Sequence, residues 1–281
     1  MIDLHTHTTF SDGTDSPLAL VKKAASSGVT VLGLTDHDST AGWAEAVAAL
    51  HGKLQLALGA EISCLTEDGV SVHMLGLLFD GENQPLQQLL ADTRDTRIPR
   101  MKKMIKNLQG AGFDITLEDV AAATPPGATL GRPHLADALV AKKIISSRDE
   151  AFAGLINNES PHYVSHFAPT PEDSIKAIRA AGGVAVIAHP FASRRGQTLT
   201  PESFNSLVAA GLNGIEVFHR DQSEEERAQL LQIARELELA ITGSSDYHGT
   251  GKLNQLGENT TAATEWERLE SMASHRRVVS R

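Results

Sequence analysis

The stretch VAVIAHP, at residues 184–190, is an apolar run that ends in a histidine and a proline. Its first five residues carry no charge, which is typical of a strand that is buried on both faces of a parallel sheet. His189 follows directly, at the carboxyl end of the expected strand. In an α/β barrel the active site is built at the carboxyl ends of the strands. The stretch therefore predicts a buried strand that presents a functional side chain.

Apolar runs and helical segments alternate along most of the chain. Further strands are expected at residues 2–5, 29–35, 54–64, 70–79, 214–218 and 240–242. The expected helices span residues 17–28, 43–51, 171–181, 201–210, 224–238 and 266–275. This alternation implies an α/β fold with a parallel sheet, and the number of units favours a barrel over an open sheet. A length of 281 residues suits a single barrel with an insertion.

The strand pattern disappears between residues 85 and 167. Helical segments are expected there at 85–111, with an interruption near Pro99, and at 116–123, 132–143 and 148–156. We therefore predict that residues 1–84 and 168–281 form the barrel and that residues 85–167 form a helical insertion domain. The first inserted helix is basic, and such a run usually forms a solvated helical face. The residues concerned are Arg94, Arg97, Arg100, Lys102, Lys103 and Lys106.

Composition narrows the class of protein. Hydrophobic residues make up 41% of the chain and charged residues 21%, so a sizeable core can form. A net charge of −10 disfavours duplex DNA as a partner, because such binding requires many neutralised phosphates, but leaves a short nucleotide or RNA open. No apolar run approaches the roughly 18 residues of a membrane span. No obligate protein partner is implied.

The chain has one cysteine, Cys64, which excludes an intramolecular disulfide. We expect this residue to be a small buried apolar side chain rather than a ligand or a nucleophile. Met1 stands only four residues before His5, which leaves no room for a signal peptide before the first candidate ligand. Both features lead us to expect a cytoplasmic protein.

Histidines and acidic residues gather where the expected strands end. His5 and His7 are two residues apart, so in extended chain their side chains leave the same face and can bind one ion. Imidazole nitrogens and carboxylate oxygens are ligands for several divalent metals, and this many of them indicate more than one ion. The candidates are His5, His7, Asp36, His37, Glu61, His73, His134, His189, Glu216, Asp246 and His248. We expect the other histidines not to be ligands, with His219 the nearest to the site; they are His51, His162, His166, His219 and His275.

Short motifs along nearly the whole chain resemble those of the PHP (polymerase and histidinol phosphatase) family, in the family's order. They are HTH at 5–7, SDG at 11–13, TDHD at 35–38, GAE at 59–61, GRPH at 131–134, AHP at 188–190, GIEV at 214–217 and SDYH at 245–248. The resemblance implies a distorted (β/α)7 TIM-like barrel that carries two or three divalent metal ions. Mixed imidazole and carboxylate sites without thiolate favour manganese, with zinc or iron as alternatives.

The resemblance also implies which residues hold each ion. A first ion would be bound by His5, His7, Glu61 and Asp246. A second would be bound by Glu61, His73 and His134, which places one ligand in the insertion, and a third by Asp12, His37 and His248. Other members have histidine where this chain has Asp12, so the third site would be more acidic here.

Paired ions bridged by Glu61 would activate a hydroxide that attacks phosphorus and would clamp the attacking and leaving oxygens. His189 is a candidate for protonating the leaving group, and Asp36 for orienting a neighbouring ligand. Arg132 is expected beside the second ion, where its guanidinium can bind phosphate. The remaining candidate substrate residues are Arg194, Arg195 and Tyr163, although simple packing also accounts for Tyr163.

Within the family, GRPH at 131–134 and YVSH at 163–166 resemble the branch of 3′,5′-nucleoside bisphosphate phosphatases and RNase AM. This branch implies release of the 3′ phosphate from a nucleoside bisphosphate to give a 5′-mononucleotide. Three alternatives stay open: a 5′–3′ exoribonuclease that acts on short RNA at the same site, a histidinol phosphatase, and a non-catalytic module stabilised by metal. The acidic net charge favours a small substrate.

Overall fold

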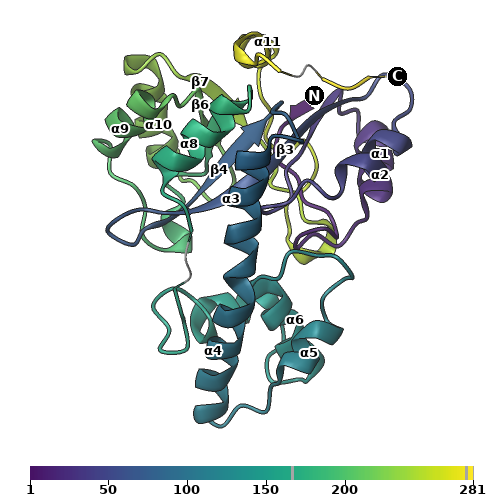
Figure 1. Ribbon diagram of the computed structural model, residues 1–281, viewed down its shortest axis with the longest axis vertical. Coiled ribbons are helices and arrows are strands. Elements are labelled where there is room, and N and C mark those ends of the chain that lie inside the picture. Colours follow the sequence, from purple (N-terminus) through teal and green to yellow (C-terminus); the bar gives the residue numbers. More distant parts are fainter. Residues whose placement is uncertain (166–167, 276–277, 281) are drawn as a thin grey trace.

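A computed structural model describes residues 1–165, 168–275 and 278–280 and has a mixed α/β fold (Figure 1). Within these residues, seven strands form one sheet in the order β1 to β7. A parallel bridge between Thr6 and Tyr247 brings the chain that follows β1 beside the chain that follows β7, so the sheet is nearly closed into a barrel. The predicted α/β barrel is confirmed. The strands are β1 (Ile2–Asp3), β2 (Val31–Leu34), β3 (Gln55–Leu65), β4 (Ser71–Leu77), β5 (Val184–Ala188), β6 (Gly214–Phe218) and β7 (Ala240–Gly243).

The prediction of an all-parallel sheet is wrong for one strand. β4 runs antiparallel to both β3 and β5, whereas the other neighbouring strands are parallel. The physical reason is the connection: only residues 66–70 separate β3 from β4, and a parallel neighbour would need a crossover of a dozen residues or more. Thr66 and Val70 close this turn through a backbone hydrogen bond of 2.9 Å. The start of β4 therefore lies at the edge of the sheet where the other strands end.

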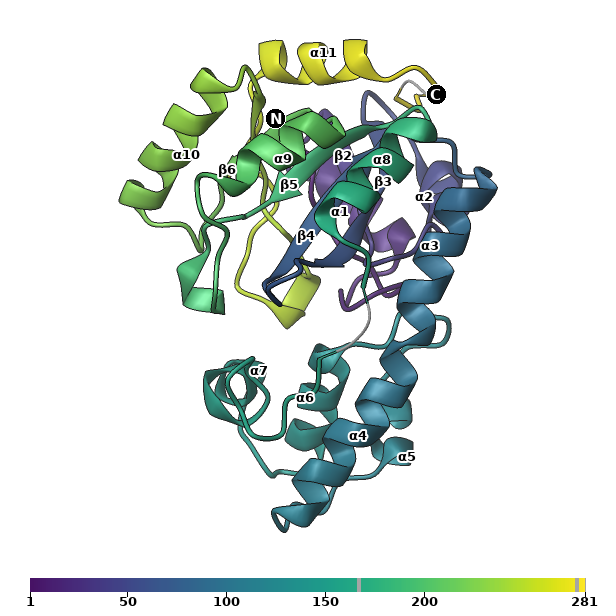
Figure 2. The ribbon, with the colours of Figure 1, turned by 60° about the vertical axis from the view of Figure 1, so that its left-hand side comes forward.

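Among the described residues, the six helices that the alternating pattern predicted all pack around the sheet (Figure 2). Ser16 caps the first helix, because its Oγ accepts the Ala19 N–H at 3.2 Å, and Pro17 occupies the first helical position. Apolar side chains such as Ile178 and Phe204 pack against strand residues such as Met74 and Ile187, and each fully buried side chain of this size contributes roughly 1.5–3 kcal/mol. The six are α1 (Pro17–Ser26), α2 (Trp43–Ala49), α8 (Pro171–Ala180), α9 (Ser203–Ala210), α10 (Glu224–Glu236) and α11 (Ala263–Met272).

The segment between β4 and α8 is helical, and most of it lies beyond the end of the sheet opposite α11 (Figure 2). The expected long first helix is two helices, and the break falls at Thr96 rather than at Pro99. Leu86 and Leu90 pack into the barrel core, whereas the residues from Met101 onward form a hydrophobic core of their own. The helices are α3 (Gln84–Asp95), α4 (Arg97–Gly110), α5 (Leu117–Ala122), α6 (Arg132–Ala141) and α7 (Arg148–Glu150), which continues into a π-helical turn, η1 (Ala151–Leu155).

The basic face predicted for the first inserted helix is only partly exposed. Lys102, Lys103 and Lys106 are exposed as expected, but Arg97 and Arg100 are buried. They are buried because they share the inner face of α4 with Met101 and Met104, at helical spacing. In the described parts of the chain, no helix combines the length and apolar character that a membrane crossing requires.

Candidate metal centre

Glu61, which is 1% exposed on β3, lies at the centre of a group of histidines. Its Oε2 is 3.2 Å from His5 Nε2, 3.0 Å from His7 Nε2 and 3.1 Å from His37 Nδ1. Its Oε1 is 2.7 Å from His73 Nδ1, which the antiparallel β4 brings to this edge of the sheet. The carboxylate therefore has imidazoles on both of its oxygens and is arranged to bridge two cations.

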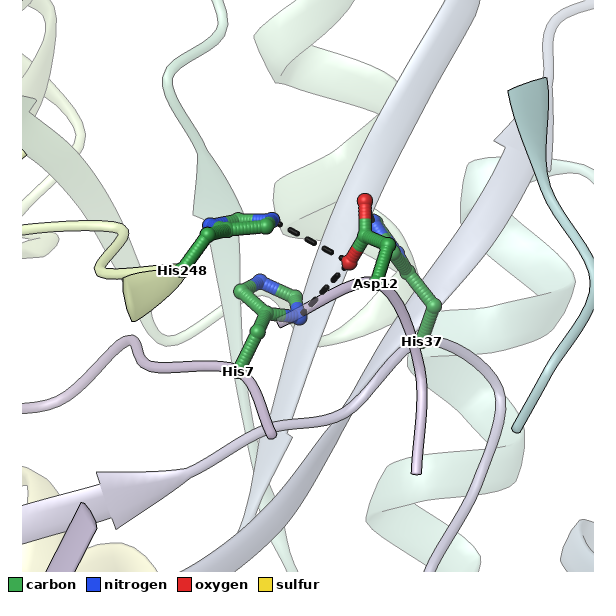
Figure 3. A group of neighbouring side chains, drawn as sticks. All are labelled: His7, Asp12, His37 and His248. Atoms are coloured by element: carbon green, nitrogen blue, oxygen red, sulfur yellow. Dashed lines mark ion pairs between the residues drawn. The ribbon is translucent and has the colours of Figure 1, made fainter. Parts of the chain in front are cut away.

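A second group consists of His7, Asp12, His37 and His248 (Figure 3). Asp12 Oδ1 lies 3.2 Å from His248 Nε2 and 3.7 Å from His7 Nδ1. Asp12 Oδ2 lies 3.8 Å from His37 Nε2. Each of the four residues offers a ligand atom within 4.8 Å of the others. His7 and His37 also contact Glu61, so the two groups are contiguous.

Asp246 joins the first group from the chain that follows β7. Its Oδ1 lies 3.5 Å from His5 Nε2 and 3.4 Å from His7 Nε2. Its Oδ2 faces the other way and accepts hydrogen bonds from Arg195 Nη2 at 2.8 Å and from Lys252 Nζ at 2.9 Å. One carboxylate oxygen is thus directed at the histidines and the other at two cationic side chains.

The electrostatics of the centre favour ionised carboxylates. Burial alone would raise the pKa of Glu61, but His73, His37 and His5 hold that pKa well below its usual range. Burial opposes ionisation of Asp12 in the same way, and His248 and His37 hold the pKa of Asp12 well below its usual range. The carboxylates of this centre therefore keep their negative charge while they are excluded from water.

Several polar atoms of the centre make no hydrogen bond although they are buried. A buried polar atom without a partner is costly, so each such atom in a native protein requires an explanation. Here the chemistry of the donors fits divalent cations, because imidazole nitrogens and carboxylate oxygens converge within coordinating range of one another. In the described chain these atoms are Asp12 Oδ1, His37 Nδ1, Glu61 Oε1, His73 Nδ1 and His248 Nε2.

Two other acidic residues, Glu216 and Asp36, make hydrogen bonds that position the histidines of the centre. Glu216 Oε1 lies 3.0 Å from His5 Nδ1, and Glu216 Oε2 accepts a hydrogen bond from the backbone N–H of His189 at 2.9 Å. Asp36 accepts hydrogen bonds from Thr8 and from Ser11 Oγ, the latter at 2.6 Å. Ser11 Oγ in turn lies 3.2 Å from His7 Nδ1. Such contacts fix the orientation of a ligand imidazole.

His134 and His189 are two further predicted site histidines, and their contacts differ. His134 is buried on α6, where its Nδ1 accepts the Gly131 N–H at 3.0 Å. His189 Nε2 lies 3.4 Å from Glu61 Oε1, and its ring centroid is 5.5 Å from that of His73. His189 is therefore a further candidate companion of Glu61 and His73, beside the predicted His134.

Of the two arginines predicted after His189, one enters the centre. Arg195, in the short helical turn η2 (Ser193–Arg195), has Nη1 3.0 Å from His189 Nε2 and Nε 2.7 Å from Asp221 Oδ2. Its side chain is 31% exposed, so it is reachable from solvent. Arg194 is exposed and has Glu226 as an electrostatic neighbour.

Arg132 and Tyr163 contact each other within the helical segment. The Arg132 guanidinium lies 5.2 Å from the centre of the Tyr163 ring, and its Nη1 donates to Asn158 Oδ1 at 2.6 Å. Arg100 lies over the same ring at 5.1 Å. His166, the last residue of the YVSH motif, is outside the described residues.

The sequence predicts a solvated helical face for Arg97 and Arg100 and does not mark Lys252 as a candidate site residue. The alternation of these arginines with Met101 and Met104 at helical spacing was a signal that they face inward. Lys252 follows the SDYH motif by four residues, within a glycine-rich segment, and its contact with Asp246 depends on how that segment folds back.

The remaining histidines have other surroundings. His219 is fully buried, and its Nε2 lies 3.4 Å from Asp246 Oδ2, so it borders the centre as expected. His51 is exposed, His162 lies against Phe113, and His275 lies 3.5 Å from an Asp80 oxygen. Cys64 is 1% exposed, and its Sγ donates to Ser174 Oγ at 3.2 Å. Cys64 is therefore buried, as expected.

Comparison with known proteins identifies the family. Residues 3–156, more than half of the chain, match the PHP domain. The chain belongs to the PHP family. One PHP relative, the 3′,5′-nucleoside bisphosphate phosphatase of Chromobacterium violaceum, is 32% identical over 89% of this chain and 88% of its own. Another, the 5′–3′ exoribonuclease of Haemophilus influenzae, is 33% identical over 92% of this chain and 93% of its own.

A solved PHP structure matches the whole barrel and the helical segment together. It is a candidate metal-dependent phosphoesterase from Bifidobacterium adolescentis, 41% identical, with a TM-score of 0.91 over 97% of this chain and 96% of that one. Similarity over almost the full length means that the inserted helices are part of the shared architecture. The predicted PHP family membership is confirmed.

Proposed function

We propose that this PHP protein is a metal-dependent phosphoesterase that removes the 3′ phosphate from 3′,5′-nucleoside bisphosphates and leaves a 5′-mononucleotide. The observation that carries the proposal is Glu61, whose two oxygens contact imidazoles from separate strand ends in a buried centre. The phosphatase from C. violaceum supports the choice of substrate, since it aligns with most of this chain.

The residues present suggest which side chains would hold divalent ions, with manganese favoured. His5, His7, Glu61 and Asp246 suit a first ion. Glu61, His73 and His189 suit a second, with His134 as the alternative from sequence. His7, Asp12, His37 and His248 suit a third. Bound ions would lower the pKa of an attacking water and balance the charge of the phosphate.

The proposed roles of the other residues follow from their contacts. Arg195 lies beside Asp246 and His189 with its side chain partly exposed, so we assign it to the phosphate that reacts. Burial and the neighbouring Arg195 hold the pKa of His189 well below its usual range. A neutral imidazole is a better ligand than general acid, so protonation of the leaving oxygen by His189 is the weaker of its two proposed roles. Asp36 is proposed to position His7 through Ser11.

We also propose that residues 85–167 act as an insertion domain that closes one side of the substrate site. Support comes from the separate hydrophobic core that begins at Met101 and from Arg97 of α4, which donates to Ser63 on β3 and to the Leu130 carbonyl just before α6. Hydrogen exchange tests this division: amides of α5 and α6 should exchange as one unit, at rates distinct from those of β5 and β6. A single common rate for all four elements would contradict it.

A second candidate function is 5′–3′ exoribonuclease activity at the same site. It is favoured by the relative from H. influenzae, whose identity to this chain is 33% against 32% for the phosphatase. The first activity hydrolyses a phosphomonoester and the second a phosphodiester, so the two differ in whether a further nucleotide is attached to the phosphorus that is attacked.

One set of assays separates the candidates. Adenosine 3′,5′-bisphosphate, a 5′-phosphorylated oligoribonucleotide and histidinol phosphate are incubated separately with the manganese-loaded protein. We expect the highest kcat/KM for the bisphosphate, with phosphate and 5′-AMP as products. Preferential release of mononucleotides from the oligomer would favour the exoribonuclease, preferential release of histidinol would favour the histidinol phosphatase, and no turnover of any substrate would favour a non-catalytic module.

A further inference from the structure

Three guanidinium groups gather where α4 and α6 meet the edge of the barrel. Arg97 and Arg100 are one helical turn apart on α4, and Arg132 is the first residue of α6. Arg100 and Arg132 lie over the same Tyr163 ring, at 5.1 and 5.2 Å from its centre. Arg97 Nη1 donates to the Leu130 carbonyl at 3.1 Å, two residues before Arg132. We call Arg97, Arg100 and Arg132 the arginine cluster.

The positive charge of the arginine cluster is only partly balanced. Arg97 forms an ion pair with Asp38, but within the residues that the structure describes no carboxylate pairs with Arg100 or Arg132. Arg100 is only 9% exposed, and its Nε donates to the Val164 carbonyl, a neutral acceptor. Buried charges in proteins are normally paired, so this arrangement calls for an anion.

Two further observations indicate that the cluster is strained without such a partner. Arg97 Nε is buried and makes no hydrogen bond. Burial and the nearby charges of Arg132 and Arg97 lower the pKa of Arg100 to about 10. Like charges that are held together away from water repel each other strongly, and a bound anion would relieve that repulsion.

The arginine cluster lies next to the candidate metal centre. Arg97 Nη2 contacts Asp38 and donates to Ser63 Oγ at 2.8 Å. Asp38 follows His37 in the chain, and Ser63 is two residues beyond Glu61 on β3. Two residues of a strand span about 7 Å. Arg97 therefore joins the arginine cluster to the strand that carries Glu61.

We propose that Arg97, Arg100 and Arg132, with Tyr163 between the last two, form a subsite for the nucleotide phosphate that is not hydrolysed. Guanidinium groups bind phosphate oxygens through paired hydrogen bonds, and the Tyr163 ring fixes the direction of two of the groups. This inference rests on the proposed function, because it names how that site selects a bisphosphate. The structural alternative is that the arginines only fasten the helices to the barrel.

The test compares binding of 5′-AMP with binding of adenosine, which lacks the phosphate, by calorimetry on the metal-loaded protein. The variants are Arg100→Gln and Arg132→Gln, with Lys103→Gln as the control, because Lys103 is exposed on the same helix outside the cluster. We expect Arg100→Gln and Arg132→Gln to raise the Kd of 5′-AMP about ten- to a hundredfold. The ratio of kcat/KM for the bisphosphate to that for 3′-AMP should fall by a similar factor. Lys103→Gln should change neither quantity.

Several results would overturn the proposal. One is that the wild-type protein binds adenosine as tightly as 5′-AMP. Another is that a folded Arg100→Gln protein keeps the wild-type Kd for 5′-AMP. A third is that the substitutions raise the Kd of adenosine and the Kd of 5′-AMP by the same factor. Should Arg100→Gln fail to fold, Arg100→Lys keeps the charge and loses the paired geometry, so a Kd for 5′-AMP that stays at the wild-type value would also refute the subsite. Failure of the proposed function is a separate outcome: the wild-type protein would bind 5′-AMP through the cluster without hydrolysing the bisphosphate.

Discussion

Glu61 illustrates how one side chain depends on several segments of the chain. It comes from β3, yet its oxygens contact histidines that follow β1, follow β2 and start β4. Glu61 is 1% exposed, so its negative charge must be balanced by these neighbours or by cations. We therefore expect Glu61 to affect both the stability of the centre and its capacity to bind cations.

We expect Glu61→Gln to lose metal and activity together, because a neutral amide cannot bridge two cations. The loss of kcat/KM should exceed about a hundredfold, the upper range for residues that only support a ligand. His248→Ala should cost less, because His248 contacts Asp12 at the edge of the centre. Metal content and turnover are measured on both variants, with the exposed Glu67→Gln as a control. Near-normal turnover in Glu61→Gln would contradict the bridging role.

The Cys64 thiol should be unreactive in the native protein. Its side chain, on β3, is buried and contacts Ser174 of α8, and burial raises the pKa of the thiol well above its usual range. Since the thiolate is the reactive form, a thiol reagent such as dithionitrobenzoate should label the native protein far more slowly than the denatured protein. Comparable labelling rates in the two states would show that this part of β3 opens readily.

At the scale of elements, the connections decide where side chains arrive. The short turn between β3 and β4 reverses the strand, and this reversal delivers His73 to the same edge as Glu61. The close approach of neighbouring strands also limits which side chains fit between them. Gly33 on β2 stands so near to β1 that an added Cβ would lie 2.0 Å from the Leu4 carbonyl oxygen.

We therefore expect Gly33→Ala to destabilise the protein, by about 1–3 kcal/mol, because backbone atoms of Leu4 must move. The matched control is Gly110→Ala at the end of α4, where an added Cβ meets nothing within 4 Å. Because alanine is favoured over glycine in a helix, this control substitution should raise the free energy of unfolding by about 0.5–1 kcal/mol. Urea unfolding gives both free energies of unfolding. Equal stability of the two variants would mean that β1 and β2 tolerate a wider separation.

At the scale of the whole molecule, the barrel edge and the inserted helices together form the candidate site. The metal centre is acidic and imidazole-rich, whereas Arg195, Lys252 and the arginine cluster surround it with positive charge. This distribution differs from the overall charge of −10, which lies mostly elsewhere on the chain. Such a distribution would attract the negatively charged substrate that we propose, although the protein as a whole is acidic.

We expect the purified protein to bind at least two divalent ions per chain, with manganese favoured. Removing them should leave buried carboxylates and imidazoles without partners. A ligand whose free concentration is a hundred times its Kd adds about 2.7 kcal/mol to the free energy of unfolding. A chelator should therefore lower Tm by about 5–10 °C. Elemental analysis and thermal melting measure both effects. Less than one ion per chain after expression in metal-supplemented medium, with activity unchanged by chelator, would refute the metal-dependent mechanism.

Much of the fold was predictable because it depends on local patterns. Apolar runs such as residues 184–188 became strands since a strand buried on both faces excludes polar residues, and Ser16 with Pro17 marked a helix start by capping chemistry. The convergence of His5, Glu61 and their neighbours followed from the rule that strand ends meet at one edge.

Tertiary structure alone decided the remaining features. The direction of β4 depends on which strands pair, and that choice places His73 beside Glu61. The contact of His189 with Glu61 joins residues that are far apart in the chain, so it arises only in the folded protein. Burial of Arg100 depends on how α4 packs against residues that are distant in the chain. For this reason, arginines that the sequence predicts to be exposed to solvent face inward and form a cluster of charge. Local sequence sets which elements form, whereas contacts between residues far apart in the chain set where their side chains point.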